Sequence, residues 1–203
     1  MKGKFITFEG GEGSGKSTQS KLLRGYLKSK GLKVVFTREP GGAKISEQLR
    51  DILLDPKNKG MDKMVELGLY LSARKQLVEE IIKPALKKGK IVICDRFHDA
   101  TVAYQGYGLG VDLKLIENFK KLIGIWINPD LTVLLDIDPK QGLKRAGRVK
   151  DRLELRPDNY HKKVRAGYLT LAKKYPKRIK VISLNSGIKV IQDKIRSLVD
   201  KCL

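Results

Sequence analysis

The sequence predicts an α/β protein with three layers, in which a five-stranded parallel sheet lies between helices on its two faces. Two patterns predict this fold: short apolar runs alternate with segments of helical periodicity, and turn residues bound each run. The expected strands are Lys4–Glu9, Lys33–Thr37, Ile91–Asp95, Leu131–Asp136 and Ile179–Leu184. The chain of 203 residues suits a single domain, 1–203, and ligands of such sheets bind beyond the carboxyl ends of the strands.

A glycine-rich loop follows the first expected strand directly. It comprises Gly10, Gly11, Glu12, Gly13, Ser14, Gly15, Lys16, Ser17 and Thr18. The glycines allow backbone N–H groups to point at phosphate oxygens, Lys16 reaches the β and γ phosphates, and Ser17 is placed to ligate Mg²⁺. A helix is expected from Lys16 through Lys30, so the phosphates would also meet a helix N-terminus. The pattern predicts nucleoside triphosphate binding and the P-loop NTPase fold.

Charged residues stand at the ends of two neighbouring strands. Asp95 closes the apolar run that begins at Ile91, which is typical of a Walker B acid facing Mg²⁺ and the triphosphate. The alternative is a carboxylate that only caps a helix. Arg38 and Arg96 lie at strand ends, and because guanidinium groups match phosphate bidentately, we expect them to hold a second phosphate group.

The expected helix Asp62–Leu86 carries an aromatic residue and an arginine four positions apart. Tyr70 and Arg74 therefore share one face of that helix. A ring beside a guanidinium suits a flat heterocycle. The alternative is that Tyr70 lies at the edge of the core while Arg74 extends into solvent.

The segment after the fourth strand is strongly basic. Residues 140–156 include Arg145, Arg148 and Arg152, and we expect them to form a small basic lid that closes over the phosphates. An exposed basic helix without that role is the alternative.

The composition narrows the class of protein. No apolar stretch is long enough to span a membrane, and two cysteines without metal-type spacing predict a cytoplasmic location. The net charge of +21 attracts polyanions, but its lysine runs lack interleaved aromatic residues, so we expect a solvated face and not a nucleic-acid surface. His98 and His161 are expected to be surface or packing residues.

Several motifs together resemble the bacterial-type thymidylate kinases, which belong to the P-loop nucleoside monophosphate kinases. The resemblance runs nearly end to end. The matching segments are Phe8-Glu9-Gly10, Thr37-Arg38-Glu39-Pro40-Gly41-Gly42, Ser72-Ala73-Arg74 with Gln76, Asp95-Arg96, and Thr101 followed by Ala103-Tyr104-Gln105-Gly106.

The resemblance implies roles for individual residues. Tyr70 takes the position that stacks on thymine, and Arg74 the position that hydrogen-bonds the base. Thr101 and Tyr104 fall where the family contacts the base and guards the deoxyribose, Arg38 and Arg96 where it holds the acceptor phosphate, and Glu12 where it contacts the sugar hydroxyl.

Two positions depart from patterns found in the family. Gly13 stands where some members carry a loop arginine, so the loop cannot supply a positive charge to the transferred phosphoryl group. The resemblance assigns that charge to a lid arginine, with Arg148 as first choice and Arg145 or Arg152 as substitutes. Tyr70 is often phenylalanine, and the added hydroxyl could alter the preference among pyrimidines.

The expected activity is transfer of the γ-phosphoryl group from MgATP to dTMP by a homodimeric enzyme. No general base is needed, because the acceptor phosphate is already an anion. A broader pyrimidine nucleoside monophosphate kinase remains open, since a methyl group gives limited discrimination. A nucleic-acid-binding ATPase is the alternative from another class.

Overall fold

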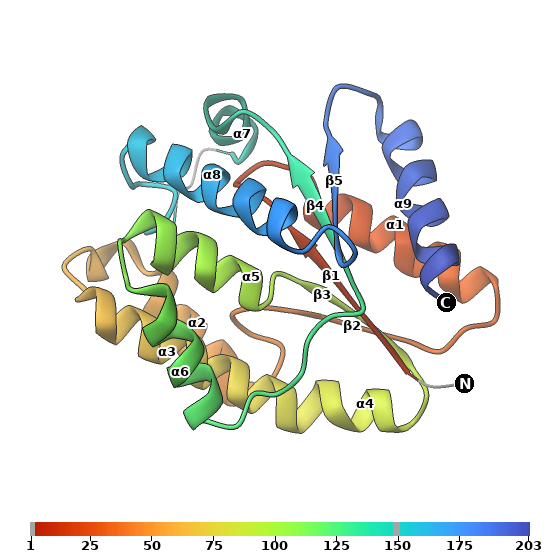
Figure 1. Ribbon diagram of the computed structural model, residues 1–203, viewed down its shortest axis with the longest axis horizontal. Helices are drawn as coiled ribbons and strands as arrows, with labels where there is room; N and C mark the ends of the chain where they lie inside the picture. The colour runs from red at the N-terminus through yellow and green to blue at the C-terminus, as the bar shows by residue number, and fades with distance from the viewer. Residues whose placement is uncertain (1–2, 148–150) are drawn as a thin grey trace.

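The computed structural model describes residues 3–147 and 151–203, and the five strands in it form one sheet (Figure 1). The strands are β1 Lys4–Glu9, β2 Val34–Arg38, β3 Ile91–Asp95, β4 Leu131–Asp136 and β5 Ile179–Ser183. The α-helices are α1 Lys16–Ser29, α2 Lys44–Leu54, α3 Lys63–Leu77, α4 Lys83–Lys87, α5 His98–Thr101, α6 Leu113–Leu122, α7 Pro139–Arg145, α8 Asp158–Lys174 and α9 Ile188–Cys202. None of the helices in the described residues is long and apolar enough to cross a membrane.

The sheet is parallel throughout and has the order β2-β3-β1-β4-β5. Each observed strand matches its predicted range to within one residue at either end. The predicted α/β class and parallel sheet are therefore confirmed. Because the connections carry the chain first to one side of β1 and then to the other, β1 lies at the centre, where the strand order switches.

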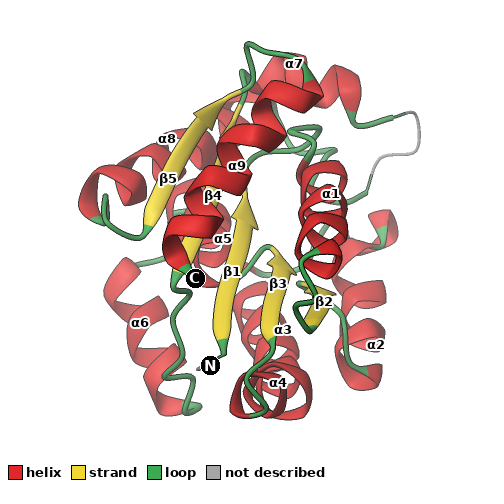
Figure 2. Ribbon diagram, turned by 90° about the vertical axis from the view of Figure 1, so that its right-hand side faces the viewer, coloured by secondary structure: helices red, strands yellow, loops and turns green. Residues whose placement is uncertain are grey.

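Alternation along β1 divides its side chains between the two faces of the sheet. Ile6 and Phe8 pack into a core with Leu23 and Leu27 of α1 and with residues of α9. Phe5 faces the opposite side and meets Leu77 of α3 in a second core. Figure 2 shows α1 and α9 on one side of the strands and α3 and α4 on the other, which gives the three layers.

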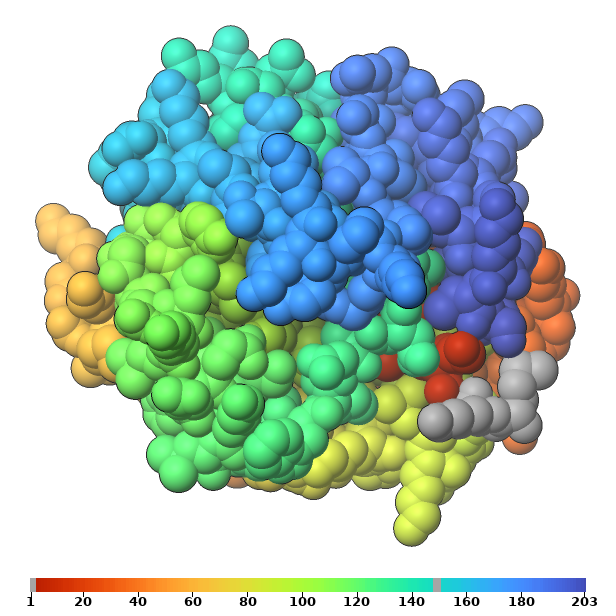
Figure 3. Space-filling model, viewed as in Figure 1, coloured from red at the N-terminus to blue at the C-terminus, as the bar shows by residue number. Residues whose placement is uncertain are grey.

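A nearly continuous helical segment runs from α3 through a π-helical turn, Val78–Ile82, into α4. Pro84 follows that turn and has no backbone N–H, so it cannot donate the hydrogen bond that a regular α-helix would need at this position. A second π-helical turn, Val102–Gly108, follows α5. On the face shown in Figures 1 and 3, α8 lies in front of the strands. Ligands of such parallel sheets bind beyond the carboxyl ends of the strands.

Candidate active site

One cleft at the carboxyl edge of the sheet, with a volume of about 420 Å³, collects most of the predicted site residues. Its lining includes Glu12, Gly13, Ser14, Gly15, Lys16, Ser17, Thr18, Arg38, Tyr70, Arg74, Asp95, Arg96, Thr101 and Tyr104. Gly10 and Gly11 instead line a much smaller cavity behind the loop. Arg148 lies outside the described residues. The cleft thus brings together distant segments of the chain, as in the hydrogen bond from Tyr104 to Glu12, which are 92 positions apart.

The P-loop wraps around the amino group of Lys16. Lys16 Nζ donates to Gly10 O at 3.1 Å and to Gly11 O at 2.8 Å, and burial lowers the pKa of this amine to about 8. Gly13 has φ +63°, and a β-carbon there would lie 1.9 Å from Gly142 O of α7. The close approach of the α7 backbone therefore excludes an arginine at this position. This gives a structural reason why the loop has glycine at position 13.

Ser17 and Asp95 meet at the start of α1. Ser17 Oγ donates to Asp95 Oδ2 at 2.8 Å. A hydroxyl and a carboxylate oxygen are ligands that suit Mg²⁺, which is usually held by one or two carboxylates together with water and substrate phosphates. The described residues contain no cluster of three or more His, Cys, Asp or Glu that could hold a metal ion, so any Mg²⁺ here depends on such additional oxygens.

Arg96 stands on a strained turn between β3 and α5. Its φ is +70°, the one positive value among the described residues other than glycine. The turn is held by hydrogen bonds from Arg96 N to Phe8 O at 2.9 Å and from Phe97 N to Glu9 Oε1 at 2.7 Å. A side chain held in a rare backbone conformation at a cleft is typical of a functional site.

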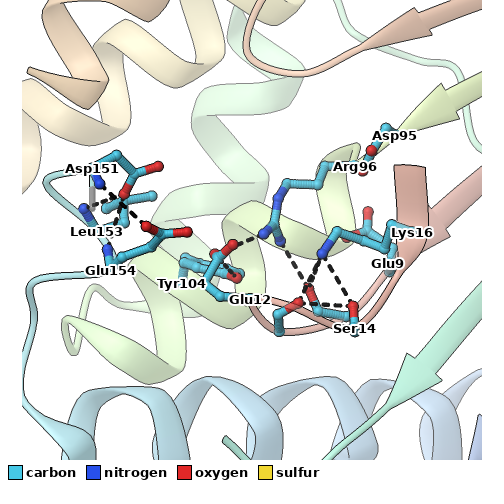
Figure 4. A network of polar contacts seen from close by, with 12 residues as sticks. Glu9, Glu12, Ser14, Lys16, Asp95, Arg96, Tyr104, Asp151, Leu153 and Glu154 are labelled. Atoms are coloured by element: carbon cyan, nitrogen blue, oxygen red, sulfur yellow. Dashed lines mark hydrogen bonds and ion pairs between the residues drawn. The ribbon is translucent and has the colours of Figure 1, made fainter. Parts of the chain in front are cut away.

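The guanidinium of Arg96 reaches across the loop to Glu12 (Figure 4). Arg96 Nη2 donates to Glu12 Oε1 at 2.7 Å, Nη1 donates to Gly10 O at 2.9 Å, and the Tyr104 ring lies 4.8 Å from the guanidinium carbon. Burial alone would raise the pKa of Glu12, but Arg96 and Lys16 outweigh it and lower this pKa to about 2. Glu12 is therefore a carboxylate at neutral pH.

Two further arginines line the cleft near Arg96. Arg38 is about half exposed and pairs with Glu47 at 2.9 Å. Arg50, which sequence reasoning missed, donates from Nη1 to Pro40 O at 2.8 Å, and burial together with the nearby Arg38 lowers its pKa. The sequence did not single out Arg50 as a site residue, because α2 carries other charged residues as well.

Tyr70 and Arg74 form the other end of the cleft, and the alternative in which Arg74 extends into solvent is wrong. Arg74 is only 1% exposed, and Tyr70 is buried as well. Arg74 Nε donates to Glu39 Oε2 at 2.7 Å and Nη2 donates to Thr101 Oγ1 at 2.7 Å. Burial raises the pKa of Glu39 to about 7, although the pairing with Arg74 opposes this shift.

The described parts of the predicted lid are residues 140–147, most of which belong to α7, and residues 151–156. Arg145, at the end of α7, is exposed and lies beside Gly13. Arg152 is not available as a lid arginine in this structure, because its side chain is buried: Nη1 donates to Glu66 Oε2 at 2.6 Å and Nε donates to Leu53 O at 2.7 Å. Glu66 is completely buried and also accepts from Arg156 at 2.7 Å. This segment is thus tied to α3 and to the end of α2.

His98 and His161 are expected to be surface or packing residues, and His98 differs from this expectation in one respect. Both are buried, which fits packing residues, but His98 has a partner that the sequence did not reveal. His98 Nε2 is hydrogen-bonded to Glu117 of α6, and Nδ1 faces Arg74 Nη1 at 3.4 Å. The partner lies 19 residues away on another helix, so no local pattern could have identified it.

Comparisons with known proteins agree with this geometry. The thymidylate kinase family model matches residues 8–195. The thymidylate kinase of Exiguobacterium sp. is 47% identical over 198 residues, which are 96% of this chain and 93% of that protein, and that of Geotalea daltonii is 51% identical over 195 residues, with 92% and 91% covered. The crystal structure of thymidylate kinase from Ehrlichia chaffeensis superposes with a TM-score of 0.81 at 37% identity and covers 98% of this chain and 99% of that one. With the P-loop, the Asp95-Arg96 turn and the Arg74 pocket lining one cleft, these similarities show that the chain belongs to the thymidylate kinase family.

Proposed function

We propose that the protein transfers the γ-phosphoryl group of ATP to dTMP and releases dTDP and ADP. The observation that supports this most strongly is the single cleft, which joins a complete P-loop at one end to a buried tyrosine and arginine pocket at the other. Arg96 lies between the two ends and contacts the P-loop. Membership in the thymidylate kinase family supports dTMP as the acceptor.

The donor end is assigned to the P-loop. Lys16 and the loop N–H groups would hold the β and γ phosphates, and Ser17 with Asp95 would hold Mg²⁺. Bound Mg²⁺ would neutralise phosphate charge as the phosphoryl group moves. The close packing of Gly13 against α7 fixes the loop relative to the residues that lead into the lid.

The acceptor end is assigned to residues on three elements. Tyr70 would stack on the base, while Arg74 and Thr101 would hydrogen-bond its edge. Tyr104 and Glu12, which are hydrogen-bonded to each other at 2.7 Å, would flank the deoxyribose.

The acceptor phosphate is assigned to the arginines of the cleft. Arg38 and Arg96 would hold it in line with the donor, and Arg50 adds a third positive charge nearby. Phosphoryl transfer depends on such positioning and charge neutralisation, so no general base is assigned. We propose that a lid arginine neutralises the negative charge on the transferring phosphoryl group, with Arg148 as first choice and Arg145 as second.

The test is a coupled ADP-release assay with MgATP against dTMP, dUMP, dCMP, dGMP and UMP. We expect kcat/KM to be highest for dTMP, with dUMP lower by roughly 10- to 200-fold because it lacks one methyl contact. Single-stranded DNA in place of a monophosphate should leave turnover at its basal rate. Equal rates with all pyrimidine monophosphates would replace the proposal with the broader kinase, and stimulation by DNA alone would replace it with the nucleic-acid-dependent ATPase.

We also propose that the enzyme is a cytoplasmic homodimer. A location in the cytoplasm follows from the proposed use of ATP and dTMP and fits the two free cysteines. Exposed apolar side chains on α2, α3 and α6 support an interface: Ile45, Ile52, Val65, Leu115 and Leu122 are 42 to 83% exposed.

Sedimentation equilibrium tests the dimer. We expect the wild-type mass to be twice that of the 22.8 kDa chain, and Ile52→Lys to shift the equilibrium toward monomer because it places a charge in the interface. Ile188→Lys on α9 changes another exposed isoleucine, which lies outside the proposed interface, and should leave the mass unchanged. A monomeric wild-type protein at micromolar concentration would contradict the proposal.

A further inference from the structure

We propose that His98 is a positioning residue for base recognition, which holds the guanidinium of Arg74 in the orientation that reads the nucleobase and is itself held by Glu117. This inference rests on the proposed function, because it assumes that Arg74 contacts the base. It adds a residue pair, His98 and Glu117, that lies behind the cleft and does not line it.

The contacts of Arg74 show why its orientation needs a further partner. A guanidinium has five N–H donors and no acceptor. Within the described part of the chain, Nε donates to Glu39, and Nη2 donates to Thr101 Oγ1 and to Phe97 O at 3.2 Å. Nη1 faces His98 Nδ1 at 3.4 Å, so one N–H of Nη1 remains to be directed at a ligand in the cleft.

The chemistry of these contacts assigns the tautomer of His98. Because Arg74 can only donate, Nδ1 must carry the lone pair and Nε2 the proton, which is donated to the Glu117 carboxylate. Burial lowers the pKa of His98 to about 4, against the raising effect of Glu117, so the ring is neutral at physiological pH. The hydrogen bond from His98 lowers the pKa of Glu117 to about 2.

The charges around His98 come from two elements. Arg74 approaches from α3, while Glu117 and Lys120 approach from α6, with Lys120 Nζ 3.5 Å from Glu117 Oε2. Glu117 is 45% exposed at its side chain, and α6 lies on the outside of the molecule in Figures 1 and 2. A hydrogen-bonded chain therefore runs from a surface carboxylate through a buried imidazole to the arginine of the base pocket.

This chain acts on the acceptor end of the cleft alone. Without the Nδ1 acceptor, a buried N–H of Arg74 would lose its partner and the guanidinium could turn toward other acceptors. The donor end, where Lys16 is held by Gly10 and Gly11, has no contact with His98. The expected signature is therefore a change in KM for dTMP without a change in KM for ATP.

Steady-state kinetics of four variants test the inference. His98→Leu removes both hydrogen bonds at similar volume, and we expect KM for dTMP to rise about 10-fold while kcat and KM for ATP stay within about 3-fold. His98→Asn places an amide oxygen near the position of Nδ1 and should restore KM for dTMP to within about 3-fold of wild type. Glu117→Ala, at a partly exposed site, should raise KM for dTMP about 3-fold, whereas Asn118→Ala on the exposed side of α6 should not change it.

The outcomes separate this inference from the proposed function. Wild-type KM for dTMP in both His98→Leu and Glu117→Ala would overturn the inference while leaving dTMP kinase activity in place. Equal losses in His98→Leu and His98→Asn, with kcat and both KM values moving together, would also overturn it in favour of a purely structural role. A wild-type protein that does not phosphorylate dTMP would overturn both.

Discussion

Replacement of Arg96 by alanine is expected to lower kcat/KM for dTMP by about 10³-fold or more. Arg96 contacts the P-loop, through Gly10 O, and also the acceptor-end residue Tyr104, through its ring. Its removal takes away a charge that would stabilise the phosphoryl groups and also leaves Glu12 without its ion-pair partner. Because Arg96 is the charge that most lowers the pKa of Glu12, its removal would also raise that pKa, and the carboxylate that remains ionised would repel a phosphate.

A glycine variant separates the side chain of Arg96 from its backbone. With φ at +70°, alanine at position 96 keeps a strain of about 1 to 2 kcal/mol that glycine does not have. Arg96→Gly should therefore be as inactive as Arg96→Ala but more stable in urea unfolding. Recovery of activity in the glycine variant would show that the turn, and not the guanidinium, limits catalysis, which would contradict the role proposed for Arg96.

The sequence predicted the fold closely because each strand is bounded by strong local signals. The apolar run Ile91 to Cys94 ends at a charged residue, and Gly31 and Gly89 have positive φ values at turns that precede β2 and β3. The P-loop was equally local, since strand, glycines and helix follow one another without interruption. Asp95 and Arg96 could be placed with the P-loop because the ends of parallel strands meet at one edge of a sheet.

The rest of the cleft depends on contacts between distant segments. Arg50 lines it because α2 packs on α3, and the buried state of Arg74 depends on Glu39, which lies 35 positions earlier. Arg152 belongs to a basic segment that predicts an exposed lid, yet its guanidinium is buried against Glu66, 86 positions away. Such contacts between distant residues cannot be predicted from the pattern of charge or periodicity within one segment.

The pairing around Glu66 predicts the largest effect on stability. Glu66 is completely buried and holds Arg152 and Arg156, and its other oxygen accepts from Gln105 Nε2 at 2.9 Å. In Glu66→Ala the buried guanidinium of Arg152 loses its counter-ion. Breaking a buried ion pair from one side costs about 3 to 5 kcal/mol, so we expect a loss of that size in the free energy of unfolding, measured by urea denaturation.

A carboxylate with two cations on the surface provides the matched control for Glu66. Glu79 accepts from Lys75 and from Lys83, each at 2.7 Å, but all three side chains are 38 to 44% exposed. Glu79→Ala should therefore change the unfolding midpoint little, because exposed ion pairs are weakened by solvent and salt. If Glu66→Ala were as harmless as Glu79→Ala, the segment from 151 to 156 would not be anchored through Glu66. If the loss is large, the arginines that follow the lid contribute to folding, and the search for the arginine that acts on the phosphoryl group narrows to Arg145 and Arg148.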